Sequence, residues 1–273
     1  MRLAIVTIQR NRGKWLSEWF AFHHLQGVDR FIFYAHRCDD ETPAVIAALG
    51  NKVNITAYSI PDNTERPQLA AYNHAYRNHG HESDWFAFID GDEFLFTTDA
   101  LDLKASLQEY QYKKISAVGV YWACFGSNGH LKEPAGLITQ NYTRRAPLDA
   151  EFNRHIKSIV RGHQGAHFQA DQNAHLFSTI YGTFDEIGRP INSGISEHAP
   201  STTRFRINHY ACQSREFYEK FKRSSGAADA GANVIRPETW WEMYDRNDEQ
   251  DYLLARGSEK IEAFLSQNGS NIV

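Results

Sequence analysis

The sequence has few cysteines, no Cys-x-x-Cys pair and no long apolar run. Its 3 cysteines, Cys38, Cys124 and Cys212, are widely spaced. Neither a disulfide framework nor a zinc knuckle is therefore predicted, and a reducing compartment is expected. No stretch approaches the ~20 consecutive apolar residues of a membrane span.

An excess of basic charge is also missing. The chain has 29 Lys and Arg against 33 Asp and Glu, which gives a net charge of −4. A surface that binds the phosphates of nucleic acid would be strongly cationic, so a nucleic-acid enzyme is not expected.

The N-terminus lacks the features of a signal peptide. The short apolar run Leu3–Ile8 is followed at once by Gln9 and Arg10. A signal peptide needs a longer apolar region and a small-residue cleavage site. We therefore expect a cytoplasmic chain whose first β-strand lies at 3–8.

Aromatic residues, by contrast, are abundant. The 6 Trp, 13 Tyr and 17 Phe make up 13% of the 273 residues. Such a composition suits a core rich in rings or a groove that stacks sugars and bases, and it does not separate the two.

Apolar runs alternate with helical patterns through the first half of the chain. The runs predict strands at 3–8, 31–35, 53–58, 85–89 and 115–121. Helical spacing, with Pro near two of the starts and Gly at three of the ends, predicts helices at 14–26, 43–49, 67–79 and 101–111. This alternation is typical of an α/β fold with a mostly parallel sheet flanked by helices, which binds ligands at the carboxyl ends of its strands.

The second half has a different pattern. Short β-like runs at 137–142, 155–160, 175–181 and 205–210 lie among loops, and helices are predicted at 214–223 and 248–265. No linker separates the halves. We therefore expect one domain over 1–273, in which 1–122 build the sheet and 123–273 add β and loop segments and C-terminal helices at its edge.

The residues with the most distinctive chemistry are Asp90-Gly91-Asp92-Glu93, directly after the predicted strand 85–89. Alternate side chains of an extended segment share a face, so Asp90 and Asp92 are expected to converge on one ligand. Two carboxylates this close repel each other unless a cation lies between them, and such a site suits Mg²⁺ or Mn²⁺. The ion would clamp a diphosphate as a leaving group.

A solvated acidic turn is the plain alternative for this motif. Apolar segments flank it on both sides, at 85–89 and at 94–96. Burying carboxylates between two apolar segments is costly, so the position favours a functional site.

With this motif the sequence resembles the glycosyltransferases of the GT-A fold, and more closely glycosyltransferase family 92 (DUF23-like) and its bacterial family-2-like relatives. The resemblance covers roughly residues 3–223. It rests on segments in the family's order: Trp15-Leu16-Ser17-Glu18-Trp19 with His23 and Gly27-Val28, Phe33 to Thr42, Phe125 to His130, Tyr142 to Arg145, His155 to Arg161, and Asn208-His209-Tyr210. It implies a Rossmann-like GT-A sheet with a nucleotide-sugar-binding half at 1–122 and an acceptor-side half at 123–273.

The resemblance also implies roles for individual residues. Asp92 and His209 would be metal ligands, and Asp90 would bind the metal or the donor ribose. The other donor-binding residues would be Thr7, Asn11, Asp39, Asp40, Lys157 and Arg161, and the acceptor side would hold Trp122, Gly126, Ser127, Gly129 and His130. Plain structural alternatives are a core histidine for His209, a helix cap for Asp40, exposed strand charges for Lys157 and Arg161, an ordinary turn for 126–130 and a core residue for Trp122.

The implied reaction moves a sugar, galactose or a similar hexose, from a UDP-sugar to a hydroxyl of a glycan or lipid-linked saccharide. The family resemblance implies inversion, with Mn²⁺ or Mg²⁺ as cofactor. An inverting transferase needs a carboxylate base, and Asp149, Glu151 and Asp171 lie in the region where it would fall. A lipid-linked acceptor would bring the chain to the inner membrane face as a peripheral protein.

Two positions depart from the family pattern. Arg12 stands where relatives often carry Glu, and Gln213 stands where they often carry Lys. Loss of that lysine would weaken neutralisation of the diphosphate, for which Arg12, Arg215 or Lys220 could substitute.

Two other classes of protein remain as alternatives. The first is a catalytically inactive module that binds nucleotide sugar or glycan, in which the changes at Arg12 and Gln213 mark a decayed site. The second is a haloacid-dehalogenase phosphatase with Asp90 as the nucleophile. The phosphatase fits less well, because Phe94 stands where that class carries Thr or Val.

Overall fold

The structure, a computed structural model, describes residues 1–50, 52–99, 102–163, 168–225 and 235–267. Its strands are β1 Leu3–Gln9, β2 Arg30–His36, β3 Ile55–Ile60, β4 Trp85–Phe88, β5 Glu93–Thr97, β6 Ala117–Cys124, β7 Arg144–Arg145, β8 Ile156–Arg161, β9 Thr183–Phe184, β10 Pro190–Ile191, β11 Phe205–His209 and β12 Glu249–Gln250. Its α-helices are α1 Gly13–Leu25, α2 Thr42–Leu49, α3 Pro67–His79, α4 Leu103–Gln108, α5 Ile138–Asn141, α6 Arg215–Phe217, α7 Arg223–Ser225, α8 Glu238–Tyr244 and α9 Ser258–Gln267. Short 3₁₀ turns lie at Glu151–Arg154 (η1) and Ala255–Gly257 (η4), and a π-helical turn at Tyr218–Lys222 (η3) joins α6 to α7.

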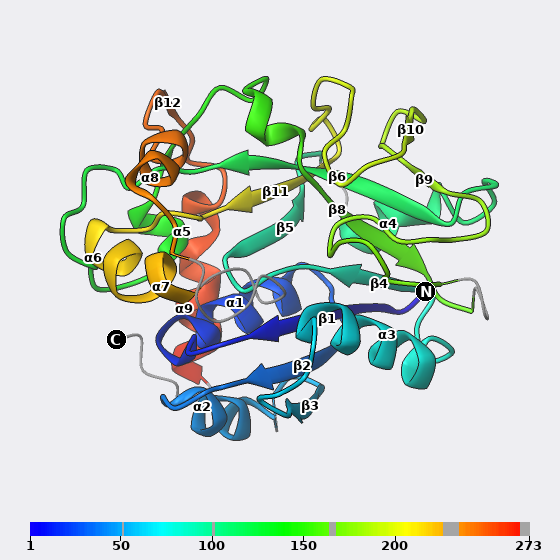
Figure 1. Cartoon of the computed structure of the whole chain (residues 1–273), viewed down its shortest axis with the longest axis horizontal. Helices are drawn as coiled ribbons and strands as arrows, with labels where there is room; N and C mark the ends of the chain where they lie inside the picture. Colours follow the sequence, from blue (N-terminus) through cyan, green and yellow to red (C-terminus); the bar gives the residue numbers. More distant parts are fainter. Residues whose placement is uncertain (51, 100–101, 164–167, 226–234, 268–273) are drawn as a thin grey trace.

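One mixed sheet passes through both halves of the chain (Figure 1). Its main order is β10-β9-β6-β8-β4-β1-β2-β3, and β3, β2, β1 and β4 run parallel to one another. β8 lies antiparallel between β4 and β6, so the second half supplies a strand to the middle of the sheet. The expected α/β sheet flanked by helices is therefore confirmed.

The two faces of the sheet carry separate helices, because successive side chains of a strand point to opposite sides. Leu3 and Ile5 of β1 pack in the core cluster that contains α1. Ala4 and Val6 of the same strand pack in the cluster that contains Tyr72 and its neighbours on α3. Among the described residues, no helix combines the length and apolar character needed to cross a bilayer.

Several predictions for the second half are wrong. Segment 137–142 contains the short helix α5 instead of a strand, and 175–181 contributes only an isolated bridge between Gln169 and Ser178. The predicted helix at 248–265 is replaced by β12, η4 and the later helix α9, and α8 lies outside the prediction. β8 and β11, by contrast, lie where the runs at 155–160 and 205–210 predicted strands.

Helix α1 fixes the acidic segment through two ring side chains. The indole N–H of Trp19 donates to the Glu93 carbonyl at 2.9 Å. His23 contacts the Trp19 carbonyl through Nδ1 at 2.8 Å, and its Nε2 accepts from the Leu95 amide at 3.1 Å. Burial lowers the pKa of His23 to about 3, so the ring stays neutral and serves as a connector between α1 and β5.

A third side chain of α1, Glu18, connects this helix to the second half. Its carboxyl oxygens accept hydrogen bonds from the backbone N–H groups of Ile138 and Thr139, at 2.6 and 2.9 Å, and from the Thr139 hydroxyl at 2.8 Å. Burial raises the pKa of Glu18 from 4.5 to about 7, although these hydrogen bonds act in the opposite direction. The buried Glu18 side chain thus holds α5 against α1, although the two segments are 120 residues apart in the sequence.

We expect Glu18 to make stability fall as pH rises. Because its pKa is raised in the folded state, the stability it contributes is fully present below 4.5 and is lost as pH rises to about 7. This shift corresponds to about 3 kcal/mol. Urea unfolding of the wild type and of Glu18→Gln between pH 4.5 and 8 should give a difference in free energy of unfolding that changes across this window. Parallel pH profiles for the two proteins would contradict the assignment.

Candidate active site

The acidic segment lies at the carboxyl edge of the parallel strands, between β4 and β5. Gly91 packs so closely against Gln9, at the end of β1, that a Cβ atom at this position would clash with the Gln9 side chain. The guanidinium of Arg12 donates to the Gly91 carbonyl at 3.1 Å. A larger residue at this position would have to displace the buried Gln9 side chain, and the segment sits beside the loop that follows β1.

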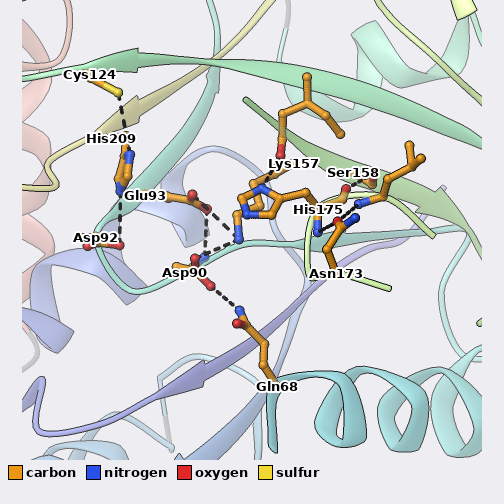
Figure 2. A network of polar contacts seen from close by, with 12 residues as sticks. Gln68, Asp90, Asp92, Glu93, Cys124, Lys157, Ser158, Asn173, His175 and His209 are labelled. Atoms are coloured by element: carbon orange, nitrogen blue, oxygen red, sulfur yellow. Dashed lines mark hydrogen bonds and ion pairs between the residues drawn. The ribbon is translucent and has the colours of Figure 1, made fainter. Parts of the chain in front are cut away.

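Asp90 turns toward the sheet interior and is held there by two side chains (Figure 2). Lys157 Nζ lies 2.8 Å from Asp90 Oδ2, and Gln68 Nε2 lies 2.7 Å from Asp90 Oδ1. The same ammonium group is 3.9 Å from Glu93 Oε1, and the Lys157 side chain is 1% exposed. Lys157 is thus a buried cation shared by two carboxyl groups.

Burial shifts the pKa values of this cluster strongly. It raises the pKa of Glu93 to about 8, against the attraction of Lys157. For Asp90 burial also acts upward, but Lys157 outweighs it and the pKa lies below its usual value. Burial lowers the pKa of Lys157, yet the two carboxylates outweigh this effect and hold the pKa above its usual value.

Asp92 faces a different set of partners. Its Oδ1 lies 3.8 Å from Nε2 of His209, the last residue of β11, and its Oδ2 accepts a hydrogen bond from Lys222. Figure 2 shows the His209 ring pointing at Asp92 while Asp90 points toward Gln68. Burial acts to raise the pKa of Asp92, but Lys222 outweighs it and the pKa lies well below its usual value. The expected convergence of Asp90 and Asp92 on one ligand is not found; Asp92 pairs with His209 instead.

Trp122 supports the imidazole of His209. The two ring centres are 4.1 Å apart, and His155 stacks on the indole at 4.7 Å with an interplanar angle of 12°. The indole is 6% exposed, so it packs as a core ring and offers no open face for a sugar. Its Nε1–H is buried and has no hydrogen-bond partner in the part of the chain that the structure describes.

A hollow of about 510 Å³ opens at the carboxyl ends of β1, β2 and β3. Asp39 lines it, together with Arg10, Arg37, Cys38 and Asp62. Asn11 bonds to Asp39 from the neighbouring loop, through the Asp39 amide at 2.9 Å and through the carboxylate. Of the predicted donor-binding residues, Asn11 and Asp39 therefore lie together beside a cavity.

Three of the other predicted donor-binding residues serve the fold. Thr7 is fully buried and accepts from Gln9, and Asp40 accepts from the backbone N–H groups of Gly13 and Thr42 at the starts of α1 and α2. Arg161 bonds to carbonyl groups at 110–115 and pairs with Trp85 at the start of β4. Because β8 runs antiparallel to β4, Arg161 lies at the opposite end of that strand from Asp90, and its predicted role in donor binding is not supported.

The predicted acceptor loop packs against the C-terminal part of the chain. A Cβ atom added at Gly126 would clash with the Arg246 carbonyl. The Ser127 amide donates to Asp245 at 2.7 Å, and His130 contacts the Asn141 carbonyl. Gly129 has a positive φ of 79° and open space around it. The loop is thus a fixed turn in this structure.

The candidate bases are not brought to the acidic segment by any described contact. Asp149 and Glu151 are exposed, on either side of Ala150. Asp171 is partly buried, and its carboxylate accepts from Ser178. None of the three is ranked above the others by its position.

The cations near Asp92 differ in part from those expected. Arg215 is paired with Glu219 and Glu238, and Lys220 is 63% exposed and paired with Glu216. Arg12 does lie close enough to attract Asp92, as expected, and Arg236 does so as well. Sequence reasoning missed Lys222, Arg236 and Gln68, the partner of Asp90. Only the tertiary fold brings these residues to the carboxyl edge of the sheet.

The chemistry of Asp92 and His209 fits a divalent ion. A carboxylate oxygen and an imidazole nitrogen are suitable ligands for Mn²⁺, and at 3.8 Å they are too far apart to bond to each other directly. The described residues contain no group of three or more His, Cys, Asp or Glu side chains placed to hold a metal. Any ion at this pair would therefore complete its coordination with ligand oxygens or water.

The mixed α/β sheet, with an Asp-x-Asp segment at the end of a central strand, has the arrangement of the GT-A class of glycosyltransferases. The sequence profile of glycosyltransferase family 92 matches residues 4–249. The chain belongs to glycosyltransferase family 92.

Curated relatives carry the same family name. A family 92 protein of Oryza sativa subsp. japonica is 32% identical over 161 residues, and one of Ricinus communis is 32% identical over 162; each alignment covers 58% of this chain. The alignments cover 26% and 28% of those proteins, so the chain spans about a quarter of their length. S. aureus TarS 1–349 in complex with UDP-GlcNAc aligns over 97% of this chain and 72% of its own, at 15% identity and a TM-score of 0.43. Glucosyl-3-phosphoglycerate synthase from Mycobacterium tuberculosis, in complex with Mn²⁺ and UDP, aligns over 44% of each chain at 16% identity and a TM-score of 0.32.

Proposed function

We propose that this domain transfers a hexose from a UDP-sugar to a hydroxyl group of a glycan or lipid-linked saccharide, with inversion and with Mn²⁺ or Mg²⁺ as cofactor. Family membership supports sugar transfer. The observation that carries the donor assignment is the grouping of Asp92, His209 and three cationic side chains at the same carboxyl edge of the sheet as the hollow that Asp39 lines. The phosphatase alternative has no support from the family match.

The nucleoside is placed in the hollow at the ends of β1 to β3. Asn11 holds the Asp39 carboxylate in position, and Asp39 in turn is suited to accept hydrogen bonds from ribose hydroxyl groups. The diphosphate then extends along the loop after β1 toward Arg12, whose guanidinium is already fixed at Gly91. Arginine suits this position because its planar donors match phosphate oxygens.

Charge neutralisation of the leaving diphosphate is the second task of the site. Asp92 and His209 would hold the divalent ion, which offsets the charge that develops on the departing phosphate. Arg12, Lys222 and Arg236 supply positive charge from the protein itself. Lys157 has a different role, because it is buried and keeps Asp90 and Glu93 in place.

In the proposed reaction the acceptor oxygen bonds to the anomeric carbon while the bond to the diphosphate oxygen breaks. The acceptor proton passes to a base, and UDP leaves with the bonding electrons. We further propose that a lipid-linked acceptor would bring the domain to the inner face of the membrane.

Thermal-shift screening with nucleotide sugars tests the donor assignment. At a concentration about 100-fold above Kd, a UDP-sugar is expected to raise the Tm by about 5 °C or more, and Mn²⁺ should increase this shift. GDP- and CMP-sugars serve as matched controls. Stabilisation by one of these instead of UDP-sugars would overturn the uridine assignment.

Transfer is separated from binding by measuring UDP release. The stabilising UDP-sugar is incubated with Mn²⁺ and a panel of saccharide acceptors, and acceptor-dependent UDP release is expected. Donor binding without any release or sugar transfer would favour an inactive binding module instead.

A further inference from the structure

The ammonium group that pairs with Asp92 belongs to Lys222, which lies in a π-helical turn. Residues 215–225 form one helical segment in which α6, η3 and α7 follow without a break, and the π-helical turn covers Tyr218–Lys222. Lys222 ends this turn and donates to Asp92 Oδ2. π-helical turns are uncommon and occur often at functional sites, because they re-aim one side chain out of the regular helix pattern.

The position of this turn is held by contacts on its two sides. Arg236 donates to the Lys222 carbonyl, and the Tyr218 hydroxyl donates to the Pro237 carbonyl at 2.9 Å. On the other side Phe217 packs edge-on against Trp15 of α1, with ring centres 5.0 Å apart. The Lys222 side chain is 18% exposed and that of Asp92 is 10% exposed, so the ion pair is largely shielded from water.

Positive charges surround the acidic segment. Four cationic side chains, Arg12, Lys157, Lys222 and Arg236, interact with the carboxyl groups of Asp90, Asp92 and Glu93, and Arg12 also faces Glu18, Asp40 and Glu133. A free divalent cation approaching Asp92 would meet the Lys222 ammonium at the same carboxylate, and the two positive charges repel each other. A diphosphate would relieve that repulsion, because it offers the ammonium a second anionic partner.

We propose that Lys222 is an exchangeable cation. It forms an ion pair with Asp92 when no donor is bound, and it moves to the diphosphate when the donor binds. This movement frees Asp92 for the divalent ion. This inference rests on the proposed function and adds a binding order to it. The nucleotide binds first and Mn²⁺ binds tightly only with it. Lys222 is then a donor-binding residue that replaces the lysine lost at the position of Gln213.

Mn²⁺ binding by the full chain, measured through the electron paramagnetic resonance signal of free Mn²⁺ with and without UDP, tests this exchange. Lys222→Met keeps the length of the side chain and removes its charge. Without UDP this variant is expected to bind Mn²⁺ roughly tenfold more tightly than the wild type, because the competing ammonium is gone. UDP should then tighten Mn²⁺ binding much less than it does in the wild type.

Three variants make the result specific. Lys220→Met removes a lysine from the same turn that pairs with Glu216, and it should leave Mn²⁺ binding unchanged. Lys222→Arg keeps the charge and should retain weak Mn²⁺ binding without UDP. Asp92→Asn should abolish tight Mn²⁺ binding under both conditions. Thermal melting of each variant verifies that it is folded.

The outcomes separate this inference from the proposed function. If Asp92→Asn abolishes binding but Lys222→Met matches the wild type, Lys222 is no competitor and the exchange is overturned, while the metal site stands. If the wild type with UDP binds no Mn²⁺, or binds it equally well in Asp92→Asn, the metal assignment and the exchange both fall.

Discussion

Asp92→Asn is expected to lower the rate of sugar transfer by roughly a hundredfold or more, while the protein remains folded. The substitution keeps the size of the side chain and removes the charge that faces both His209 and Lys222. Electrostatic stabilisation of a developing charge is typically worth this much when one of its elements is removed. The variant also leaves Arg12, Lys222 and Arg236 without their common anion, so metal-independent binding of UDP should be retained.

The measurement is the initial rate of UDP release with the donor that stabilises the protein in the thermal-shift screen. Glu259→Gln is the control, since this carboxylate is exposed on α9 and outside the described cluster. Its rate should equal that of the wild type. Wild-type activity in Asp92→Asn would show that the acidic segment takes no part in the chemistry.

The sequence predicted the part of the fold that depends on local patterns. β1, β2 and β4 and the helices α1 and α3 could be located because their apolar residues recur at the spacing of one strand or helix face. The acidic segment could be placed at a strand end for the same reason. β5, which begins at Glu93, was not predicted, because its pairing partner β11 lies more than a hundred residues further along the chain.

Long-range contacts also explain the errors in the second half. Segment 137–142 has an apolar pattern that suits a strand, but Glu18 of α1 accepts the N–H groups of Ile138 and Thr139 and so stabilises a helical turn. Arg161 was assigned to the site because the family resemblance includes the segment His155 to Arg161. The antiparallel direction of β8, which no local pattern encodes, puts only Lys157 at the acidic edge.

The sequence pointed to Asp92 and His209, and to Arg12 and Lys157 among the cations. It missed Lys222 and Arg236. Asp92 and His209 came from a motif and a family resemblance, and the structure places them 3.8 Å apart. Lys222 and Arg236 follow no motif, because a lysine at the end of a helical turn or an arginine in a loop is usually a solvated surface charge. Only the packing of the segment 215–225 against α1 brings Lys222 to Asp92.

Lys157→Met is expected to have the largest effect on stability. Removing one partner of a buried ion pair leaves an uncompensated charge and typically costs 3–5 kcal/mol, roughly the amount expected here. Lys157 is 1% exposed and contacts both Asp90 and Glu93, so two carboxyl groups lose their only described ammonium partner at once. Urea unfolding at pH 8 measures the loss directly.

The pH dependence of this loss identifies its cause. Burial already raises the pKa of Glu93 to about 8 with Lys157 present, and without the lysine this pKa rises further. The pKa of Asp90, which Lys157 holds below its usual value, rises as well. Carboxyl groups with raised pKa values stabilise the fold at low pH and lose this contribution as pH rises, so the deficit of Lys157→Met should be smaller at pH 5 than at pH 8. Adding Asp90→Asn to Lys157→Met should restore part of the stability, because it removes the carboxylate that Lys157 keeps ionised. A deficit that is independent of pH and unaffected by Asp90→Asn would mean that Lys157 acts through packing of its aliphatic chain instead of through its charge.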